Sequence, residues 1–354
     1  MDWLQSRENS DRVVSQGIYM ITDPRTDSGW IELLNASFPV PAGKSFLEDF
    51  PVWGAAGPKH KLTLAVEREG TIAATASARI TKVRLQRSTL TIGIIGAVCT
   101  RGGFQNQGLA SMLVAELKKW CVTEGASFVV LWGSGAEALY EKQGFVEIGT
   151  QFHAPISSIV RPEDFVGLGS IARGWDDSIM KILAQRNRGL VLESDDLAWI
   201  GAHKNINWYR LGDAVAAFGK GIDLDGFVHE AHGTPRVLRR LLAAIANEHP
   251  GARILGPRSF MNRMGVAPED RVGLALCLGA WVGTEEEFAR FLSIETQSRV
   301  AFDRSTGTLV CRARATKPLS LSAVLRLVFG PDVFAGVETE DLPLPLWFYG
   351  IDSA

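Results

Sequence analysis

The chain has 354 residues, of which 46% are hydrophobic, so it is long enough for two or more globular domains and does not have a disordered composition. Its 37 Lys and Arg residues nearly balance its 39 Asp and Glu residues, and the formal net charge is -2. Because no excess of positive charge is available to neutralise phosphates, we expect no nucleic acid among its partners.

Neither a membrane anchor nor an export signal is predicted. The longest apolar runs have the length of a strand, well below the roughly 20 residues of a bilayer crossing. The chain starts with acidic residues where a secretory signal would be basic and then apolar. The four cysteines lie far apart without a CxxC pair, which argues against a disulfide framework and a zinc knuckle. We therefore expect a cytoplasmic protein with buried cysteines and no membrane partner.

The first 150 residues predict a strand-rich sheet followed by alternating helices and strands. β-branched residues dominate three early runs, a Glu69-Gly70 turn separates the first two, and apolar residues then recur at helical spacing up to Cys121. In chain order we predict helices at 27–38 and 44–50, strands at 61–67, 71–83 and 88–99, a helix at 108–121, a strand at 127–132 and a helix at 136–142.

The chain also contains an internal repeat. Residues 228–266 follow the order of residues 94–145: a strand, a helix, a strand, a short helix, and a glycine followed by an apolar residue. The second long helix is expected to begin with Thr234 as its N-cap and Pro235 in its first turn. Two leading helices of this second copy are predicted at 177–186 and 194–200.

The repeat fades after Trp281, where the remaining pattern predicts helices at 284–292 and 320–329 and a strand at 308–315. The predicted organisation is a first domain at 1–155, a second domain at 156–285 and a C-terminal extension at 286–354. We expect the extension to pack on the second domain or to complete it.

One segment between a strand and a helix carries the chemistry. Residues 105–110, with the sequence Gln-Asn-Gln-Gly-Leu-Ala, lead into the helix that ends at Cys121. Backbone N–H groups at the start of a helix have no intrahelical partners, and together with the helix dipole they can hold a diphosphate without a lysine. Gly108 and Ala110 would let a ligand approach the backbone closely. The Gly-Lys-Ser/Thr sequence of a P-loop and the glycine spacing of a Rossmann fingerprint are both missing.

This segment resembles the GNAT superfamily of acyl-coenzyme A N-acyltransferases, whose signature Gln/Arg-x-x-Gly-x-Gly/Ala matches residues 105–110. Residues 139–145, Leu-Tyr-Glu-Lys-Gln-Gly-Phe, are also similar to that superfamily's Leu-Tyr-Glu-Lys-x-Gly-Phe segment. The resemblance covers about residues 20–150. It departs from the family where Arg101-Gly102 replaces a common His-Pro and where Asn106 replaces a common glycine.

The resemblance implies an α/β (α+β) fold class: tandem GNAT folds, with a mixed central sheet flanked by helices and a degenerate second copy. It also implies acetyl-CoA as co-substrate and no metal. The backbone of Val98 and Thr100 would pair with the pantetheine arm like an added strand, and the Val98 N–H is the expected donor to the thioester oxygen. The pyrophosphate would be held by the amides of Gln105, Asn106, Gln107, Gly108, Leu109 and Ala110.

Tyr140 is the candidate catalytic residue that the resemblance implies. It would protonate the departing thiolate of coenzyme A, which suits a phenol because its pKa of about 10 lies near that of a thiol. The alternative is an ordinary core aromatic on a short helix. A general base is also required, and Glu67 or Glu69 is within plausible reach, although solvated turn charges are the more ordinary interpretation of both.

The second copy is predicted to be non-catalytic. When the copies are aligned by their long helices, residues 230–235 take the place of the pyrophosphate loop, where Pro235 has no N–H, and Met261 takes the place of Tyr140. His229 and His232 do not form a zinc motif, because they are three residues apart on a predicted strand and point to opposite faces. Residues 223–226 read as a turn, since no glutamate follows at the last position of a calcium loop.

A catalytic first copy followed by a degenerate second copy resembles the enhanced-intracellular-survival (Eis) family of amine acetyltransferases. In that family the terminal carboxylate returns to the active site as a base, so Ala354 is a speculative neighbour of Tyr140 here. The apolar end, residues 344–354, is expected to dock on the molecule. The chain is shorter than members of that family, so a complete third domain is not expected.

The sequence thus predicts an acetyl-CoA-dependent N-acetyltransferase in which a bound amine attacks the thioester directly; the alternative is a non-catalytic acyl-CoA-binding sensor or scaffold. The walls of the acceptor pocket are expected from residues 46–53, from residues 71–83 and from the second copy. Aminoglycosides, polyamines, protein lysines and amino acids all stay open as small-molecule or peptide acceptors, and acyl groups longer than acetyl stay open as well. The apolar second copy would also suit packing in a homo-oligomer.

Overall fold

The computed structural model describes residues 13–15, 17–40, 42–54, 60–133, 136–166, 171–186, 188–311, 314–330, 342–344, 346 and 348. Within these residues the first half of the chain contains β1 (Val13–Ser15), β2 (Ile18–Met20), α1 (Ser28–Ser37), α2 (Phe46–Asp49), α3 (Pro51–Gly54), β3 (Lys61–Arg68), β4 (Thr71–Arg84), β5 (Thr89–Thr100), α4 (Leu109–Thr123), β6 (Phe128–Leu131), α5 (Glu137–Glu141) and β7 (Val146–Pro155).

Two short 3-10 helices, η1 (Ile156–Ser158) and η2 (Pro162–Phe165), lead into the second half. Its elements are β8 (Ala172–Arg173), α6 (Asp177–Ala184), β9 (Gly189–Leu190), α7 (Ser194–Gly201), β10 (Asn207–Leu211), β11 (Ala214–Phe218), β12 (Phe227–His232), α8 (Pro235–Glu248), β13 (Arg253–Gly256), α9 (Arg258–Met264), η3 (Pro268–Asp270) and β14 (Val272–Trp281). The C-terminal extension adds α10 (Glu285–Thr296), β15 (Val300–Asp303), β16 (Thr308–Cys311), β17 (Arg314–Ala315) and α11 (Leu321–Phe329).

Helix α4 shows how the sequence pattern builds the first half. One face of the helix carries apolar residues four positions apart and is buried in a core shared with strands β3, β4 and β5. These residues are Leu109, Leu113, Leu117 and Cys121. Gly93 of β5 lies directly under this helix, since a Cβ there would overlap the Sγ atom of Cys121. The close approach places the C-terminal end of α4 over the first half of β5.

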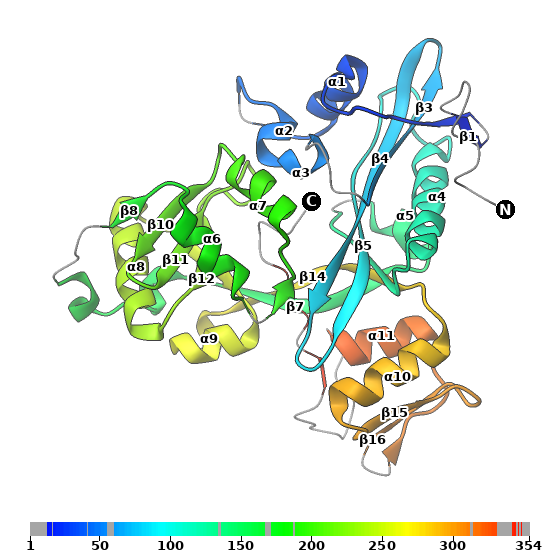
Figure 1. Cartoon of the computed structure of the whole chain (residues 1–354). Helices are drawn as coiled ribbons and strands as arrows, with labels where there is room; N and C mark the ends of the chain where they lie inside the picture. Colours follow the sequence, from blue (N-terminus) through cyan, green and yellow to red (C-terminus); the bar gives the residue numbers. More distant parts are fainter. Residues whose placement is uncertain are drawn as a thin grey trace.

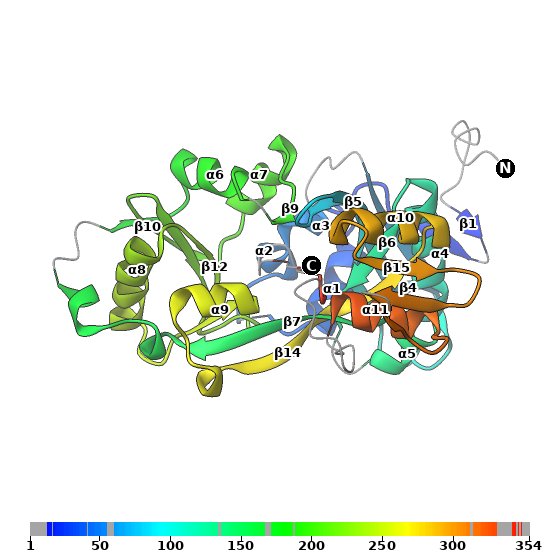
Figure 2. The ribbon, with the colours of Figure 1, turned by 90° about the horizontal axis from the view of Figure 1, so that it is seen from below.

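The two halves share a single 14-stranded sheet because each contributes a strand to the other. Strands β7 and β14 pair antiparallel, from Val146 opposite Gly279 to His153 opposite Val272. On its other edge β14 pairs with β6 of the first half, and β7 pairs with β13 of the second half. Figure 1 shows the halves on either side of this strand pair, and in Figure 2 β7 and β14 run side by side between them.

The mixed sheet flanked by helices confirms the predicted fold class. The strand exchange crosses the predicted boundary near residue 155, because β7 and β14 each belong to one copy by sequence and extend the sheet of the other. Each half of the sheet therefore depends on a segment from the other copy, and the division of the chain into three domains stays a prediction.

The C-terminal extension shares a core with strands from both halves. This core contains residues of β4, β5, β6 and β7 of the first half together with residues of β14. The rings of Phe128 on β6 and Phe329 on α11 stack with centroids 5.3 Å apart. The strand exchange places β14 next to β6 and so gives the extension a surface on the first half as well, and the expectation that the extension packs on the second domain or completes it stays a prediction.

All four cysteines are buried, as expected. Among the helices that the structure describes, none combines the length and the apolar character needed to cross a bilayer. The cytoplasmic location stays a prediction.

Candidate active site

Strands β5 and β6 separate at the place where the sequence predicts the thioester arm. They pair in parallel from Ile92 opposite Phe128 to Ile95 opposite Leu131, where β6 ends, while β5 continues to Thr100. In the described part of the chain, the edge of β5 that carries Val98 and Thr100 and faces β6 has no strand partner beyond this point. An open strand edge of this kind can accept an extended ligand as an added strand.

A β-bulge lies at the same place. The register of β4 and β5 shifts between Thr75 and Ser77, and Ala97 has a φ of 53°, in the left-handed region that a side chain disfavours. Bulges re-aim neighbouring backbone and side-chain groups, and they are enriched beside functional sites. Here the bulge stands immediately before Val98, which lines a cavity of the molecule.

The loop before α4 provides unsatisfied backbone donors. Gly108, with a φ of 78°, is the N-cap of the helix and makes no side-chain cap hydrogen bond. Gln105 and Asn106 form a turn, and among the described residues no acceptor is found for the backbone N–H groups of Gly108, Leu109 and Ala110 at the start of the helix. Asn106, which replaces a common glycine of the family, has a φ of 62°. Since asparagine tolerates this region better than most residues, the loop keeps a turn that a glycine would make. The loop is therefore suited to bind an anion.

Arg101, which departs from the family pattern, has a role outside this donor cluster. Its backbone N–H donates to the carbonyl of Ala73, and its guanidinium donates to the carbonyl of Ile72 and to Glu32 of α1. These bonds tie the start of the loop to β4 and α1. The departure at Arg101-Gly102 therefore leaves the amides of residues 105–110 unaffected.

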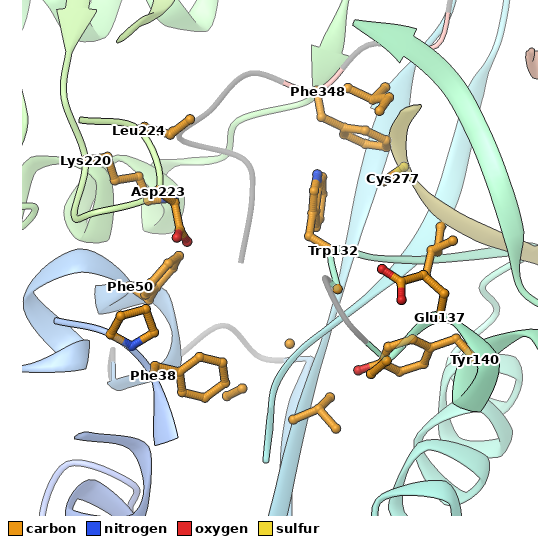
Figure 3. A pocket seen from close by; sticks show the side chains of 18 of the residues that line it. Phe38, Phe50, Trp132, Glu137, Tyr140, Lys220, Asp223, Leu224, Cys277 and Phe348 are labelled. Carbon is orange, nitrogen blue, oxygen red and sulfur yellow. The ribbon is translucent and has the colours of Figure 1, made fainter. Parts of the chain in front are cut away.

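Tyr140 lies on α5 with only 5% of its surface exposed, and Figure 3 shows its hydroxyl directed into the cavity. The turn that follows α5 explains the local motif: Gly144 has a φ of 81°, and Phe145 packs edge-on against the Tyr140 ring with centroids 6.1 Å apart. Burial raises the pKa of Tyr140 above its ordinary value, and the neighbouring Glu137 carboxylate raises it further. The phenol is thus protonated at neutral pH and able to donate.

The cavity has a volume of about 620 Å³ and is formed by both halves and by the C-terminal extension. Val98 and Tyr140 lie on the side of the first half, and Lys220 and Asp223, from the loop between β11 and β12, lie on the opposite side in Figure 3. Phe348 of the extension closes another part of the wall. A volume of this size is typical of a site for a small organic molecule.

The cavity also holds a thiol that is unsuited to act as a nucleophile. Cys277 of β14 lines the wall, and burial raises its pKa far above the usual range of a cysteine. Because the thiolate is the reactive form, this side chain behaves as a small apolar residue at neutral pH.

The candidate bases and walls of the cavity can now be compared with the structure. Glu67 and Glu69 are exposed at the β3–β4 turn, in agreement with their interpretation as solvated turn charges, whereas Glu137 and Glu147 line the cavity. Of the predicted wall segments, residues 46–53 contribute Phe46 and Phe50, while no residue from 71–83 is among the described lining residues.

Sequence reasoning did not single out Lys220, Glu137 or Phe348, because nothing in their local pattern marks them. Ala354 lies outside the described residues. Of the described residues of the apolar end, Phe348 lies at the site, where it packs edge-on against Trp132 with ring centroids 5.4 Å apart.

The second half has no counterpart of the donor loop. Only Gly233 and Thr234 join β12 to α8, whereas residues 101–108 join β5 to α4. The predicted alignment of residues 230–235 with the loop is wrong in part, because residues 230–232 belong to strand β12. Pro235 begins α8 and has no N–H, and Met261 on α9 is fully buried.

The histidines of β12 serve the packing of the second half. His229 is buried, and its Nε2 lies 3.1 Å from the carbonyl oxygen of Gly219, while His232 contacts Glu230. Glu230 is itself buried and pairs with Arg186 at 3.4 Å. Within the described residues no group of three or more His, Cys, Asp or Glu side chains could hold a metal ion.

Comparisons with known proteins agree with this geometry. Residues 28–145 match the model of the acetyltransferase (GNAT) family. Eis1 from Mycobacterium abscessus superposes with a TM-score of 0.56 at 11% identity, covering 88% of both chains. A GCN5-related N-acetyltransferase from Kribbella flavida superposes with a TM-score of 0.53 at 16% identity, covering 75% of this chain and 71% of that one.

A probable N-acyltransferase from Enterococcus faecalis gives a TM-score of 0.56 at 13% identity, covering 79% and 75% of the two chains. A search of curated proteins finds no significant match. At these identities the structural likeness establishes the fold, and the family model covers the segment that holds the donor loop and Tyr140. Residues 28–145 therefore match the acetyltransferase (GNAT) family, and the fold of the chain is similar to that of Eis1.

Proposed function

We propose that the protein is an acetyl-CoA-dependent N-acetyltransferase whose first half transfers the acyl group to a primary amine. The observation that carries the proposal is that the free edge of β5 at Val98 and the Tyr140 residue line one cavity, while the same strand β5 leads through the donor loop into the start of α4. Each of these three features matches one part of acetyl-CoA: the pantetheine arm, the thiol and the pyrophosphate.

The residues of the chain would act mainly by positioning and by hydrogen bonding. The amides of residues 105–110 would bind the pyrophosphate, and the edge of β5 would align the pantetheine arm. The Val98 N–H, re-aimed by the bulge at Ala97, would donate to the thioester oxygen as negative charge develops there. Holding the amine and the thioester in contact supplies much of the rate enhancement of such a reaction.

The bond changes assign a proton donor to Tyr140. As the amine nitrogen bonds to the carbonyl carbon, the carbon–sulfur bond breaks and the Tyr140 hydroxyl gives its proton to the sulfur. The amine loses one proton to solvent, and the phenolate recovers one from solvent, so the products are an amide and coenzyme A. Because burial keeps the Cys277 thiol protonated, we favour direct attack of the amine over an acyl-cysteine intermediate.

Coenzyme A release with a panel of amines tests the proposal. Replacing Tyr140 by Phe should lower kcat by roughly 100-fold, the lower end of the range for a general acid, while leaving calorimetric binding of acetyl-CoA unchanged. Tyr209→Phe is the matched control, since that tyrosine lies on β10 and its hydroxyl bonds to Glu248.

An unchanged rate in Tyr140→Phe would remove the acid role. Binding of acetyl-CoA without turnover of any amine would favour the alternative of a sensor or scaffold, and absence of binding would exclude both functions.

A further inference from the structure

We infer that the acceptor is a small amine with one positive charge on an aromatic or similarly flat apolar body, and not a polycation or a lysine of a folded protein. The inference rests on the proposed function and identifies the substrate class of the same site. It is drawn from the shape, the aromatic content and the charge of the cavity beyond Tyr140.

Aromatic rings form two walls of the cavity. On one wall Phe38, Phe46 and Phe50 follow one another, with ring centroids 4.7 Å and 4.8 Å apart. On the other wall Trp132 meets Phe348 edge-on, and Figure 3 shows this pair facing the Phe38 and Phe50 side across the space. Ring-lined walls favour a flat apolar body, which would gain both burial and stacking there.

The remaining wall is apolar as well. Leu276 and Leu278 of β14 are both at least 95% buried and line the cavity together with Leu255 of β13. These residues come from the second half and reach the site only because β14 is inserted next to β6. The side chain of a protein lysine would bring four methylene groups into this space and would leave most of the aromatic surface without a partner.

Few charged groups are found among the described residues that line the cavity. They are three carboxylates, Glu137, Glu147 and Asp223, and one ammonium group, Lys220. Glu147 pairs with Arg326 at 3.2 Å, and the Lys220 ammonium lies 4.6 Å from the centroid of the Phe50 ring. A polycation would have to desolvate its further charges against the aromatic and apolar walls, which is costly. A single ammonium beside Glu137 and Tyr140 avoids that cost.

The test compares kcat/KM values for coenzyme A release at saturating acetyl-CoA. The acceptors are 2-phenylethylamine and tryptamine as aromatic amines, n-butylamine as a small aliphatic amine, spermidine and kanamycin as polycations, and a lysine-containing peptide. The aromatic amines should exceed butylamine by roughly tenfold or more, as expected from burying a phenyl-sized group, and should also exceed the polycations and the peptide.

Phe50→Leu gives a second readout, because it keeps an apolar side chain and removes the ring. It should raise KM for tryptamine several-fold while changing KM for butylamine little. Phe165→Leu is the matched control, since Phe165 lies on η2 and is 42% exposed. Thermal unfolding of each variant checks that it is folded.

The possible results separate the inference from the proposed function. Turnover of spermidine, kanamycin or the peptide in preference to the aromatic amines would overturn the inference and leave the N-acetyltransferase in place. An equal effect of Phe50→Leu on tryptamine and butylamine would also count against the inference. Binding of acetyl-CoA without turnover of any amine would overturn both.

Discussion

The ring of Tyr140 lies against the backbone of Gly133, so closely that a Cβ atom at position 133 would stand 2.8 Å from the Cε2 atom of the tyrosine. Gly133 follows β6 and lines the same cavity. The absence of a side chain at Gly133 therefore determines where the Tyr140 ring can lie. Gly133 comes just after β6, the strand from which β5 separates beyond Ile95.

Gly133→Ala should displace Tyr140 and lower kcat by about tenfold or more, because shifts near 1 Å in a catalytic group have effects of that order. The melting temperature should change little, since the ring can move into the cavity. Steady-state kinetics and thermal unfolding check the two effects. Gly29→Ala is the control: it lies in α1 with no atom closer than 3.6 Å to the added Cβ, and it should leave kcat unchanged. A kcat like that of wild type in Gly133→Ala would show that this contact does not position Tyr140.

The sequence predicts those parts of the site that are formed by a continuous segment of the chain. Residues 105–110 and 139–145 each form a local turn followed or preceded by a helix, so their chemistry can be inferred from spacing alone. The free edge at Val98 also follows from the family pattern. In each case the residues that act together are near one another in sequence or lie on neighbouring strands.

The far side of the cavity could not be predicted for a physical reason. Lys220, Leu276 and Phe348 reach Tyr140 only through the exchange of β7 and β14 and through the docking of the extension on the first half. These are long-range pairings, and a repeat in sequence does not reveal whether its last strand stays in its own sheet.

A buried contact between the halves should hold the cavity loop in place. Asp49 of α2 accepts a hydrogen bond from the Asn205 side chain, and a Cβ at Gly221 would lie 2.6 Å from its carboxylate. Burial raises the pKa of Asp49, with the Asn205 bond and Lys220 acting in the opposite direction. Asp49→Ala should destabilise the protein by about 1–3 kcal/mol in denaturant unfolding, because the half-buried amide of Asn205 loses its partner.

The same change should raise KM for the amine, since Lys220 and Asp223 flank Gly221, and should leave the affinity for acetyl-CoA unchanged. Asn205→Ala tests the pairing in a double-mutant cycle. The coupling energy should be about 0.5–3 kcal/mol, as for other directly bonded neighbours. Strictly additive effects of the two changes would mean that the contact does not join the halves.

The buried His229 should make the protein sensitive to acid. Burial lowers its pKa from 6.5 to about 3, and Lys220 adds to the decrease, while the bond to the Gly219 carbonyl opposes it. His203 is also buried, and burial lowers its pKa as well, with a further contribution from the positive charge of Lys220. A folded-state pKa below the unfolded value means that the stabilisation is present above about pH 6.5 and is lost as the pH falls towards 3.

Denaturant unfolding between pH 7 and pH 5 measures this effect. The free energy of unfolding should decrease by up to about 1.4 kcal/mol per pH unit for each such histidine once the pH is well below 6.5. His229→Gln should show a shallower decrease, because the unfolded state then binds one proton fewer. The same slope in wild type and His229→Gln would show that His229 titrates in the folded protein much as in the unfolded chain.

The donor loop can be tested by removing one N–H group and keeping the helix. Ala110 is the second residue of α4, a first-turn position where proline fits the helix. Ala110→Pro removes one of the amides expected to bind the pyrophosphate, in the way that Pro235 lacks one at the start of α8. Since a hydrogen bond to a charged group contributes about 1.5–3 kcal/mol, the Kd for acetyl-CoA should rise by about 10-fold to 100-fold. Calorimetry measures this change, and Ala110→Ser, which keeps the N–H, should bind as wild type does. An unchanged Kd in the proline variant would show that the amide of residue 110 does not contact the pyrophosphate, and that only the amides of residues 105–109 remain as candidates for binding it.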